Sequence, residues 1–160
     1  MIYVVMGVCG SGKSTLGALL ANALGLPFFD ADRFHSAANL HKMEILKKSL
    51  DDSDRQPWLE LLAAKIAEWN QDRGAVLACS ALKERYRQTL AAACPIQWIY
   101  LHGSRVQLAE RMASRVNHFF PPTLLDSQLL DLEVPEYAIQ VDIGPAPDII
   151  VAEILQKLGA

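Results

Sequence analysis

The chain has 160 residues, a length typical of one domain, and 51% of them are apolar. Its 15 basic and 18 acidic residues leave a net charge of −3, which disfavours nucleic-acid and membrane partners because both need a basic surface. Three cysteines without metal-ligand spacing, a short apolar start without a basic region, and no apolar run near the length of a membrane span predict a cytoplasmic protein.

Segments with strand character and segments with helix character alternate along the chain. Strands are predicted at 2–6, 26–30, 75–80, 96–103 and 138–144. Helices are predicted at 13–24, about 34–50, 52–70, 81–93, 106–115, 123–133 and from beyond 144 to about 158, the third with Ser53 or Asp54 as its N-cap. This order predicts a single α/β domain over 1–160, with a five-stranded parallel sheet between two layers of helices, a short lid at about 115–125, and ligands beyond the carboxyl ends of the strands.

The first strand runs into a glycine-rich phosphate-binding motif. Gly7 to Ser14 (GVCGSGKS) fits G-x-x-x-x-G-K-[ST] at each fixed position, with a strand before it and a helix after it. Backbone N–H groups of such a loop face phosphate oxygens, its lysine reaches the β- and γ-phosphates, and its serine ligates Mg²⁺. The predicted ATP-binding residues are Gly7, Val8, Cys9, Gly10, Ser11, Gly12, Lys13, Ser14 and Thr15.

A pair of carboxylates follows the second strand. Asp30 and Asp32 are two positions apart, so at an extended strand end both can face one site. We expect Asp30 to anchor the Mg²⁺ shell and Asp32 to orient or deprotonate an acceptor hydroxyl, although Asp32 could instead cap the next helix. The nearby His35 fits a substrate donor and a solvated first-turn histidine equally well.

Cations near strand ends and helix starts are candidates for binding an acidic acceptor. Arg55 and Lys83 are the stronger candidates, and Arg85 and Arg87 the weaker ones. Later in the chain Arg111 and Arg115 share one helix face at an i,i+4 spacing and lead into the sequence VNHFFPP. These two arginines are typical of a lid that brings cations over transferring phosphates, although an ordinary solvated helix face is the alternative.

Five segments taken in order (MGVCGSGKST, FFDADRFH…N…KM, LDDSDRQPWL, ACSALKERYR and HFF…L.SQ…LE.P) resemble the gluconokinase family of P-loop sugar-acid kinases. The resemblance covers the chain to about Pro135. It implies an adenylate-kinase-like fold, ATP with Mg²⁺, phosphorylation of D-gluconate at its 6-hydroxyl, and a homodimer. Carried over by position, the acceptor residues are Asp32, His35, Arg55 and Lys83, and the lid residues are Arg111, Arg115 and His118.

The chain departs from the family pattern at two places. Lys47 and Ser49 stand where the family has the Gly and Pro of a Gly-x-Pro-Leu turn, with one extra residue. Without those helix breakers the preceding helix can continue toward Leu50 and reshape the acceptor site. Asn117 replaces a glycine in the lid, where asparagine tolerates a positive φ.

The leading hypothesis is therefore a kinase that transfers the γ-phosphoryl group of ATP to a sugar acid. In it Lys13, Mg²⁺, Arg111 and Arg115 stabilise the transferring group while Asp32 orients the nucleophile. A kinase of another small hydroxy acid, such as shikimate, is the nearest alternative. A slow NTP-hydrolysing regulator leaves the carboxylate pair and the cations unexplained, and a nucleic-acid kinase would need a basic groove.

Overall fold

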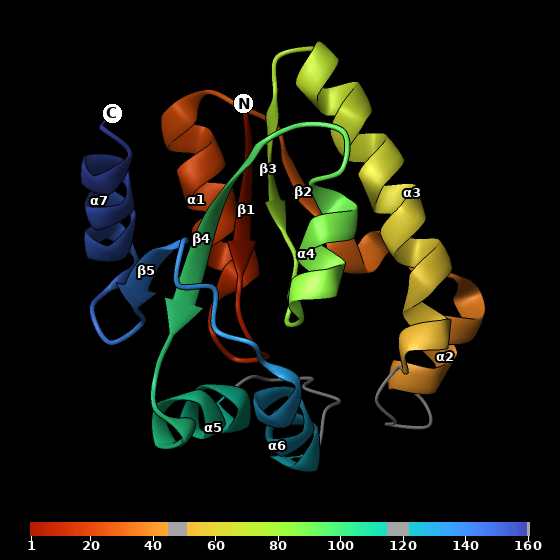
Figure 1. Ribbon diagram of the computed structural model, residues 1–160. Coiled ribbons are helices and arrows are strands. Elements are labelled where there is room, and N and C mark those ends of the chain that lie inside the picture. Colours follow the sequence, from red (N-terminus) through yellow and green to blue (C-terminus); the bar gives the residue numbers. More distant parts are fainter. Residues whose placement is uncertain (45–50, 115–121, 160) are drawn as a thin grey trace.

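The computed structural model describes residues 1–44, 51–114 and 122–159 (Figure 1). Within that part of the chain one parallel sheet has the order β2-β3-β1-β4-β5. Its strands are β1 (Ile2–Met6), β2 (Phe28–Asp30), β3 (Ala75–Ala78), β4 (Ile96–His102) and β5 (Ile139–Asp142). The helices are α1 (Lys13–Leu24), the 3₁₀ helix η1 (Ala31–Phe34), α2 (Ala37–Glu44), α3 (Asp52–Gln71), α4 (Glu84–Leu90), α5 (Arg105–Ala113), α6 (Pro122–Asp131) and α7 (Pro147–Leu158).

Helices cover both faces of the sheet. Figure 1 shows α1 and α7 on one side and α3 and α4 on the other, with α5 and α6 beyond the carboxyl ends of the strands. Alternate residues of β1 supply the two cores: Val4 packs in the core under α3 and α4, and Val5 in the core under α1 and α7. The three-layer α/β/α P-loop kinase fold predicted from the sequence is thereby confirmed, because a strand buried on both faces must send side chains into both layers.

The central strand β1 places the phosphate loop. The chain leaves β1, reaches the sheet edge at β2, returns through β3 and then crosses to β4 and β5 on the other side of β1. The crevice at such a reversal of strand order is where open parallel sheets bind ligands. Helix α1 begins directly after the loop and ends at Gly25, whose φ of 69° lets its N–H reach the carbonyls of Ala21 and Asn22.

The region after β2 differs from the prediction. In place of one helix from about Phe34, the chain forms η1, then breaks at His35 and Ser36, and restarts as α2. Ser36 explains the restart, because its Oγ accepts from the backbone N–H of Asn39 at 3.2 Å, as an N-cap does. Residues 45–50, with Lys47 and Ser49, lie outside the described residues.

Other boundaries shift by a few residues. The N-cap of α3 is Asp51, not Ser53 or Asp54, and it forms a capping box with Asp54. Helix α4 is shorter than predicted and starts only at Glu84, after a loop in which Ala81 has a φ of 45°. Of the predicted lid, residues 115–121 lie outside the described residues, while 122–125 form the start of α6. No helix in the described ranges is long and apolar enough to cross a membrane.

Candidate active site

The backbone shapes the phosphate loop. Gly10 and Gly12 have φ values of 82° and 91°, which are left-handed conformations that favour glycine. Space excludes a side chain at Gly10 as well, since an added Cβ would lie 2.8 Å from the carbonyl oxygen of Leu108 in α5. The loop therefore packs directly on α5, with its curvature fixed before any ligand binds.

Lys13 lies over the beginning of this loop. Its Nζ donates to the carbonyl oxygen of Val8 at 3.1 Å. Burial lowers the pKa of Lys13, and the carboxylate of Asp32 opposes that shift more than any other charge. A bound triphosphate would supply further negative charge here, so it would favour the protonated lysine.

Asp30 joins the start of α1 to the start of η1. Its Oδ2 accepts from Ser14 Oγ at 2.7 Å, and its Oδ1 accepts from the backbone N–H of Asp32 at 3.0 Å. Asp30 is therefore the residue that caps the next helix, and the alternative in which Asp32 does so is wrong. The expectation that both carboxylates extend from one strand end is also wrong, because the chain turns into η1 at Ala31.

Asp32 and His35 form a second part of the site. The side chain of Asp32 is 76% exposed, and its Oδ1 lies 3.9 Å from Nε2 of His35. The His35 ring is buried and stacks on Trp58 of α3 with centroids 4.1 Å apart, so a solvated histidine is excluded. Burial, followed by the charge of Arg55, lowers the pKa of His35 to about 4, and the ring is neutral at pH 7.

A group of three cations, Arg55, Lys83 and Arg85, surrounds Tyr86, and we refer to them as the acceptor-side cations. Their charged groups lie 5.5, 5.8 and 5.6 Å from the centroid of the Tyr86 ring. The Tyr86 hydroxyl accepts from Arg55 at 3.1 Å and donates to Asp52. Asp52 also pairs with Lys83 at 3.4 Å and with Arg85 at 3.0 Å. Asp52 thus pairs directly with two of these cations and is linked to Arg55 through the Tyr86 hydroxyl, so one carboxylate is shared by three positive charges.

Asp52 has a lowered pKa, chiefly because Tyr86 donates a hydrogen bond to its carboxylate, with Lys83 and Arg85 adding to the effect. Asp52 therefore stays ionised at neutral pH. Its negative charge holds the acceptor-side cations together, since without it they would repel one another around the Tyr86 ring.

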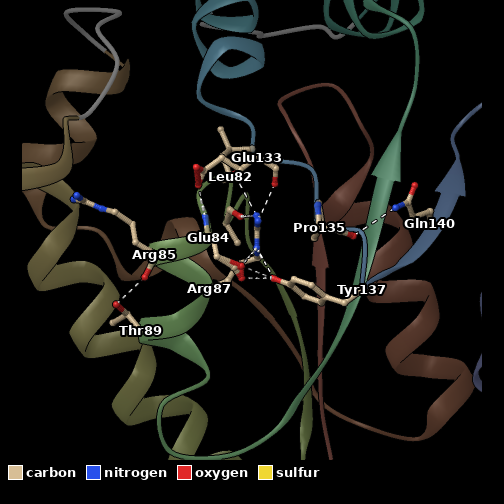
Figure 2. A network of polar contacts seen from close by, with 10 residues as sticks. Leu82, Glu84, Arg85, Arg87, Thr89, Glu133, Pro135, Tyr137 and Gln140 are labelled. Carbon is tan, nitrogen blue, oxygen red and sulfur yellow. Dashed lines mark hydrogen bonds and ion pairs between the residues drawn. The ribbon is translucent and has the colours of Figure 1, made fainter.

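Arg87 does not belong to the acceptor-side cations. Its side chain is 2% exposed and donates to the carbonyl oxygens of Ala81, Leu82 and Glu133 and to the Tyr137 hydroxyl (Figure 2). It thereby fixes the loop that carries Lys83 to the segment after α6. Arg87, one of the two weaker candidates for an acceptor contact, is therefore buried within the protein.

Glu133 completes the junction. Its Oε1 accepts from the backbone N–H of Glu84 at 2.7 Å, and its own N–H donates to the Leu82 carbonyl at 2.8 Å (Figure 2). The first turn of α4 is thus capped by a residue from beyond α6, because Lys83, at the N-cap position, makes no capping bond. Helix α6 and the acceptor-side cations are connected through this junction.

Arg111 lies on the other side of the phosphate loop. Its guanidinium donates to the carbonyl oxygen of Ile143, and a Cβ on Gly12 would lie 3.5 Å from its Nη1. A cavity of ≈ 250 Å³ opens beside it. The cavity is lined by Gly10, Gly12, Thr15, Leu16, Arg111, Ser114, Pro147 and Ile150. The predicted lid residues Arg115 and His118 lie outside the described residues.

Comparison with known proteins agrees with this geometry. The family model described as shikimate kinase matches residues 9–133. The chain is 43% identical to a probable gluconokinase from Dictyostelium discoideum, over 99% of this chain and 86% of that protein. The chain belongs to the gluconokinase family. A gluconokinase from Gluconobacter oxydans is 41% identical, over 98% of this chain and 90% of that protein.

A solved structure supports the same gluconokinase assignment. The crystal structure of a gluconokinase from Sinorhizobium meliloti 1021 superposes with a TM-score of 0.90 at 40% identity, covering 99% of this chain and 91% of that one. The chain is thus an ATP-using kinase by family, and the resemblance read from its five sequence segments is confirmed.

The structure adds residues to the gluconokinase site that the sequence did not single out. Asp52 and Tyr86 organise the acceptor-side cations, and Trp58 supports His35. On the nucleotide side Pro147 and Ile150 line the cavity beside Arg111. Asp52 and Tyr86 lie inside segments that the sequence did mark, but only tertiary contacts join α3 to α4, so no local pattern reveals the pair.

Proposed function

We propose that this chain phosphorylates D-gluconate at its 6-hydroxyl with ATP, giving 6-phospho-D-gluconate and ADP. The observation that carries the proposal is the position of Asp32. Its exposed carboxylate opposes the lowering of the Lys13 pKa by burial on one side, and its Oδ1 lies 3.9 Å from Nε2 of His35 on the other. A carboxylate between a phosphate-binding lysine and the acceptor side can accept a hydroxyl proton as the phosphoryl group moves.

The phosphate loop binds ATP through residues 7–15. Lys13 donates to the outer phosphates, and Arg111 lies over the cavity beside the loop, where the base and ribose have room. Arg115 and His118 approach from the lid by the family resemblance. Together these cations neutralise the charge that develops on the transferring group, which is the main contribution that a kinase makes.

Ser14 and Asp30 are suited to Mg²⁺. Their two oxygens lie 2.7 Å apart at the start of α1, and within the described residues no cluster of three or more acidic, histidine or cysteine side chains competes for a metal. Mg²⁺ accepts such a sparse set of protein oxygens because phosphate and water supply its other ligands. When bound, it would screen the charge of the β- and γ-phosphates.

The acceptor occupies the side of Asp32, His35 and the acceptor-side cations. Arg55 and Lys83 bind the gluconate carboxylate, since Asp52 neutralises only part of the charge around Tyr86. Neutral His35 can exchange hydrogen bonds with sugar hydroxyls but cannot pair with the carboxylate as a cation. A homodimer and a cytoplasmic location stay predictions.

An ADP-release assay tests the proposal. Purified protein with Mg²⁺-ATP is given gluconate, other aldonates, shikimate, a nucleoside monophosphate or no acceptor. We expect release that depends on gluconate, and ³¹P-coupled NMR of the product should place the phosphate on carbon 6. Release with a different acceptor would make the segment with Lys47 and Ser49 the determinant of specificity. Slow release independent of any acceptor would instead favour an NTP-hydrolysing regulator.

A further inference from the structure

A side chain of α6 reaches the phosphate loop. The backbone N–H of Cys9 donates to Gln128 Oε1 at 2.7 Å, which joins positions 119 residues apart. A backbone N–H can only donate, so the amide atom facing it must be the oxygen. The orientation of the Gln128 amide is therefore fixed, with Nε2 on its other edge.

Among the described residues, that second edge has no hydrogen-bond acceptor. Gln128 is partly exposed, and no residue in the described ranges accepts a hydrogen bond from its Nε2. A carboxamide nitrogen carries two donor hydrogens, and its geometry here is set by the bond on the oxygen side. Gln128 thus presents an oriented, uncharged donor next to the loop.

The place where this donor lies is the beginning of the phosphate loop. Lys13 Nζ bonds to the carbonyl oxygen of Val8. That carbonyl and the Cys9 N–H belong to one peptide group, so the ammonium and the Gln128 amide bind its two polar atoms. The lysine of such a loop reaches the β- and γ-phosphates. One peptide group therefore separates the Gln128 amide from the lysine that reaches the outer phosphates.

Helix α6 holds this donor firmly. Leu124 and Leu125 are buried, Asp126 makes a two-pronged ion pair with Arg105 of α5 at 2.7 and 3.0 Å, and Glu133 beyond the helix caps α4. Donors that are already oriented stabilise developing charge most effectively, because no reorganisation is needed during the reaction.

We propose that Gln128 contacts the transferring phosphoryl group, with Oε1 held by the Cys9 N–H and Nε2 donating to a γ-phosphoryl oxygen. The proposal rests on the kinase function above and adds a residue to it. The two edges of the Gln128 amide have separate tasks. Oε1 anchors the side chain on the loop, and Nε2 binds the phosphoryl oxygen whose charge changes during transfer.

The substitution Gln128→Glu separates the two tasks. A carboxylate keeps an acceptor for the Cys9 N–H, but it replaces the donor edge with a negatively charged one. We expect kcat to fall about 10²-fold, the effect typical of losing one donor to a reacting oxyanion. In calorimetry with MgCl₂ we expect affinity for a non-hydrolysable ATP analogue to fall about tenfold or more, while affinity for ADP changes less than about twofold. Gln156→Glu, the same change on an exposed position of α7, is the control.

Two results would overturn the proposal. Wild-type kinetics and analogue affinity in Gln128→Glu would show that the amide serves only as an acceptor for the loop. Equal losses for ADP and the analogue would mean that the loop itself is distorted, and the melting temperature of Gln128→Met provides a check on folding. If the wild-type protein fails to phosphorylate gluconate, the proposed function is refuted. The Gln128 contact is still tested in that case, because the affinities for the ATP analogue and for ADP are measured without an acceptor.

Discussion

The nucleotide side and the acceptor side of the site are built by different means. On the nucleotide side the backbone does most of the shaping, through two left-handed glycines and a loop packed on α5. On the acceptor side, side chains from α3 and α4 hold one another in place around Tyr86 and Asp52. Backbone geometry fits phosphate, which all nucleotides share, whereas side-chain networks can be altered to fit a particular acceptor.

Removing the charge at the centre of the nucleotide side should have the largest effect. Lys13→Ala takes away the ammonium over the outer phosphates, and we expect kcat to fall at least about 10³-fold in the ADP-release assay. Lys65→Ala, which removes a partly exposed lysine from α3, serves as the control. Turnover of Lys13→Ala within tenfold of wild type would contradict the role of the loop.

Asp32 lies where the two sides meet, and Asp32→Asn should separate chemistry from binding. The amide cannot accept a proton, so kcat should fall by about 10² to 10⁴. ATP affinity, measured by calorimetry, should change little because the loop is intact. Asp72→Asn makes the same change at an exposed site. An Asp32→Asn enzyme with near-normal turnover would refute the role of this carboxylate.

The two arginines Arg85 and Arg87 test how the acceptor side is supported. Arg87→Met removes a buried guanidinium and leaves several buried carbonyls unpaired, so we expect urea unfolding to show a loss of about 3 kcal/mol. Arg85→Met removes a cation that is more than half exposed and should change stability by less than about 0.5 kcal/mol. Similar losses in both variants would mean that the junction in Figure 2 is not what holds the loop.

The smallest expected effect is a pH dependence of stability from His35. Its pKa is about 4 in the folded protein and near 6.5 when unfolded, so the unfolded state binds more protons between these values. The contribution of His35 to the free energy of unfolding is therefore fully present above pH 6.5 and is lost as the pH falls toward 4. The urea midpoint of the wild type should decline more between pH 7 and pH 5 than that of His35→Gln. Parallel declines would argue against a buried neutral ring.

The same contrast explains how far the sequence could predict the structure. The phosphate loop, α1 and the central strands follow from local signals, namely Gly10, Gly12 and uninterrupted apolar runs, and they lie where predicted. The break after η1 was missed because Ser36 acts as an N-cap inside a helical pattern.

The arrangement of side chains was harder to predict. Arg85 and Arg87 are two residues apart on α4 and have similar sequence surroundings, yet one pairs with Asp52 on the surface and the other is buried beneath Glu133 and Tyr137. Partners about 30 to 50 residues away decide the difference, and periodicity contains no information about them. Gln128 belongs to one of the five family segments, but its bond to Cys9 joins residues 119 positions apart, which no local pattern indicates.

The position of α2 and α3 in the chain has a consequence for how such enzymes diverge. The chain departs from β2 and returns at β3, and these strands are direct neighbours at one edge of the sheet. Residues can be gained, lost or exchanged between them without changing how β1 pairs with β3 and β4. Evolution can thus alter the part of the acceptor side that lies between β2 and β3, while Lys83, Arg85 and Tyr86 after β3 and the phosphate loop after β1 keep their places.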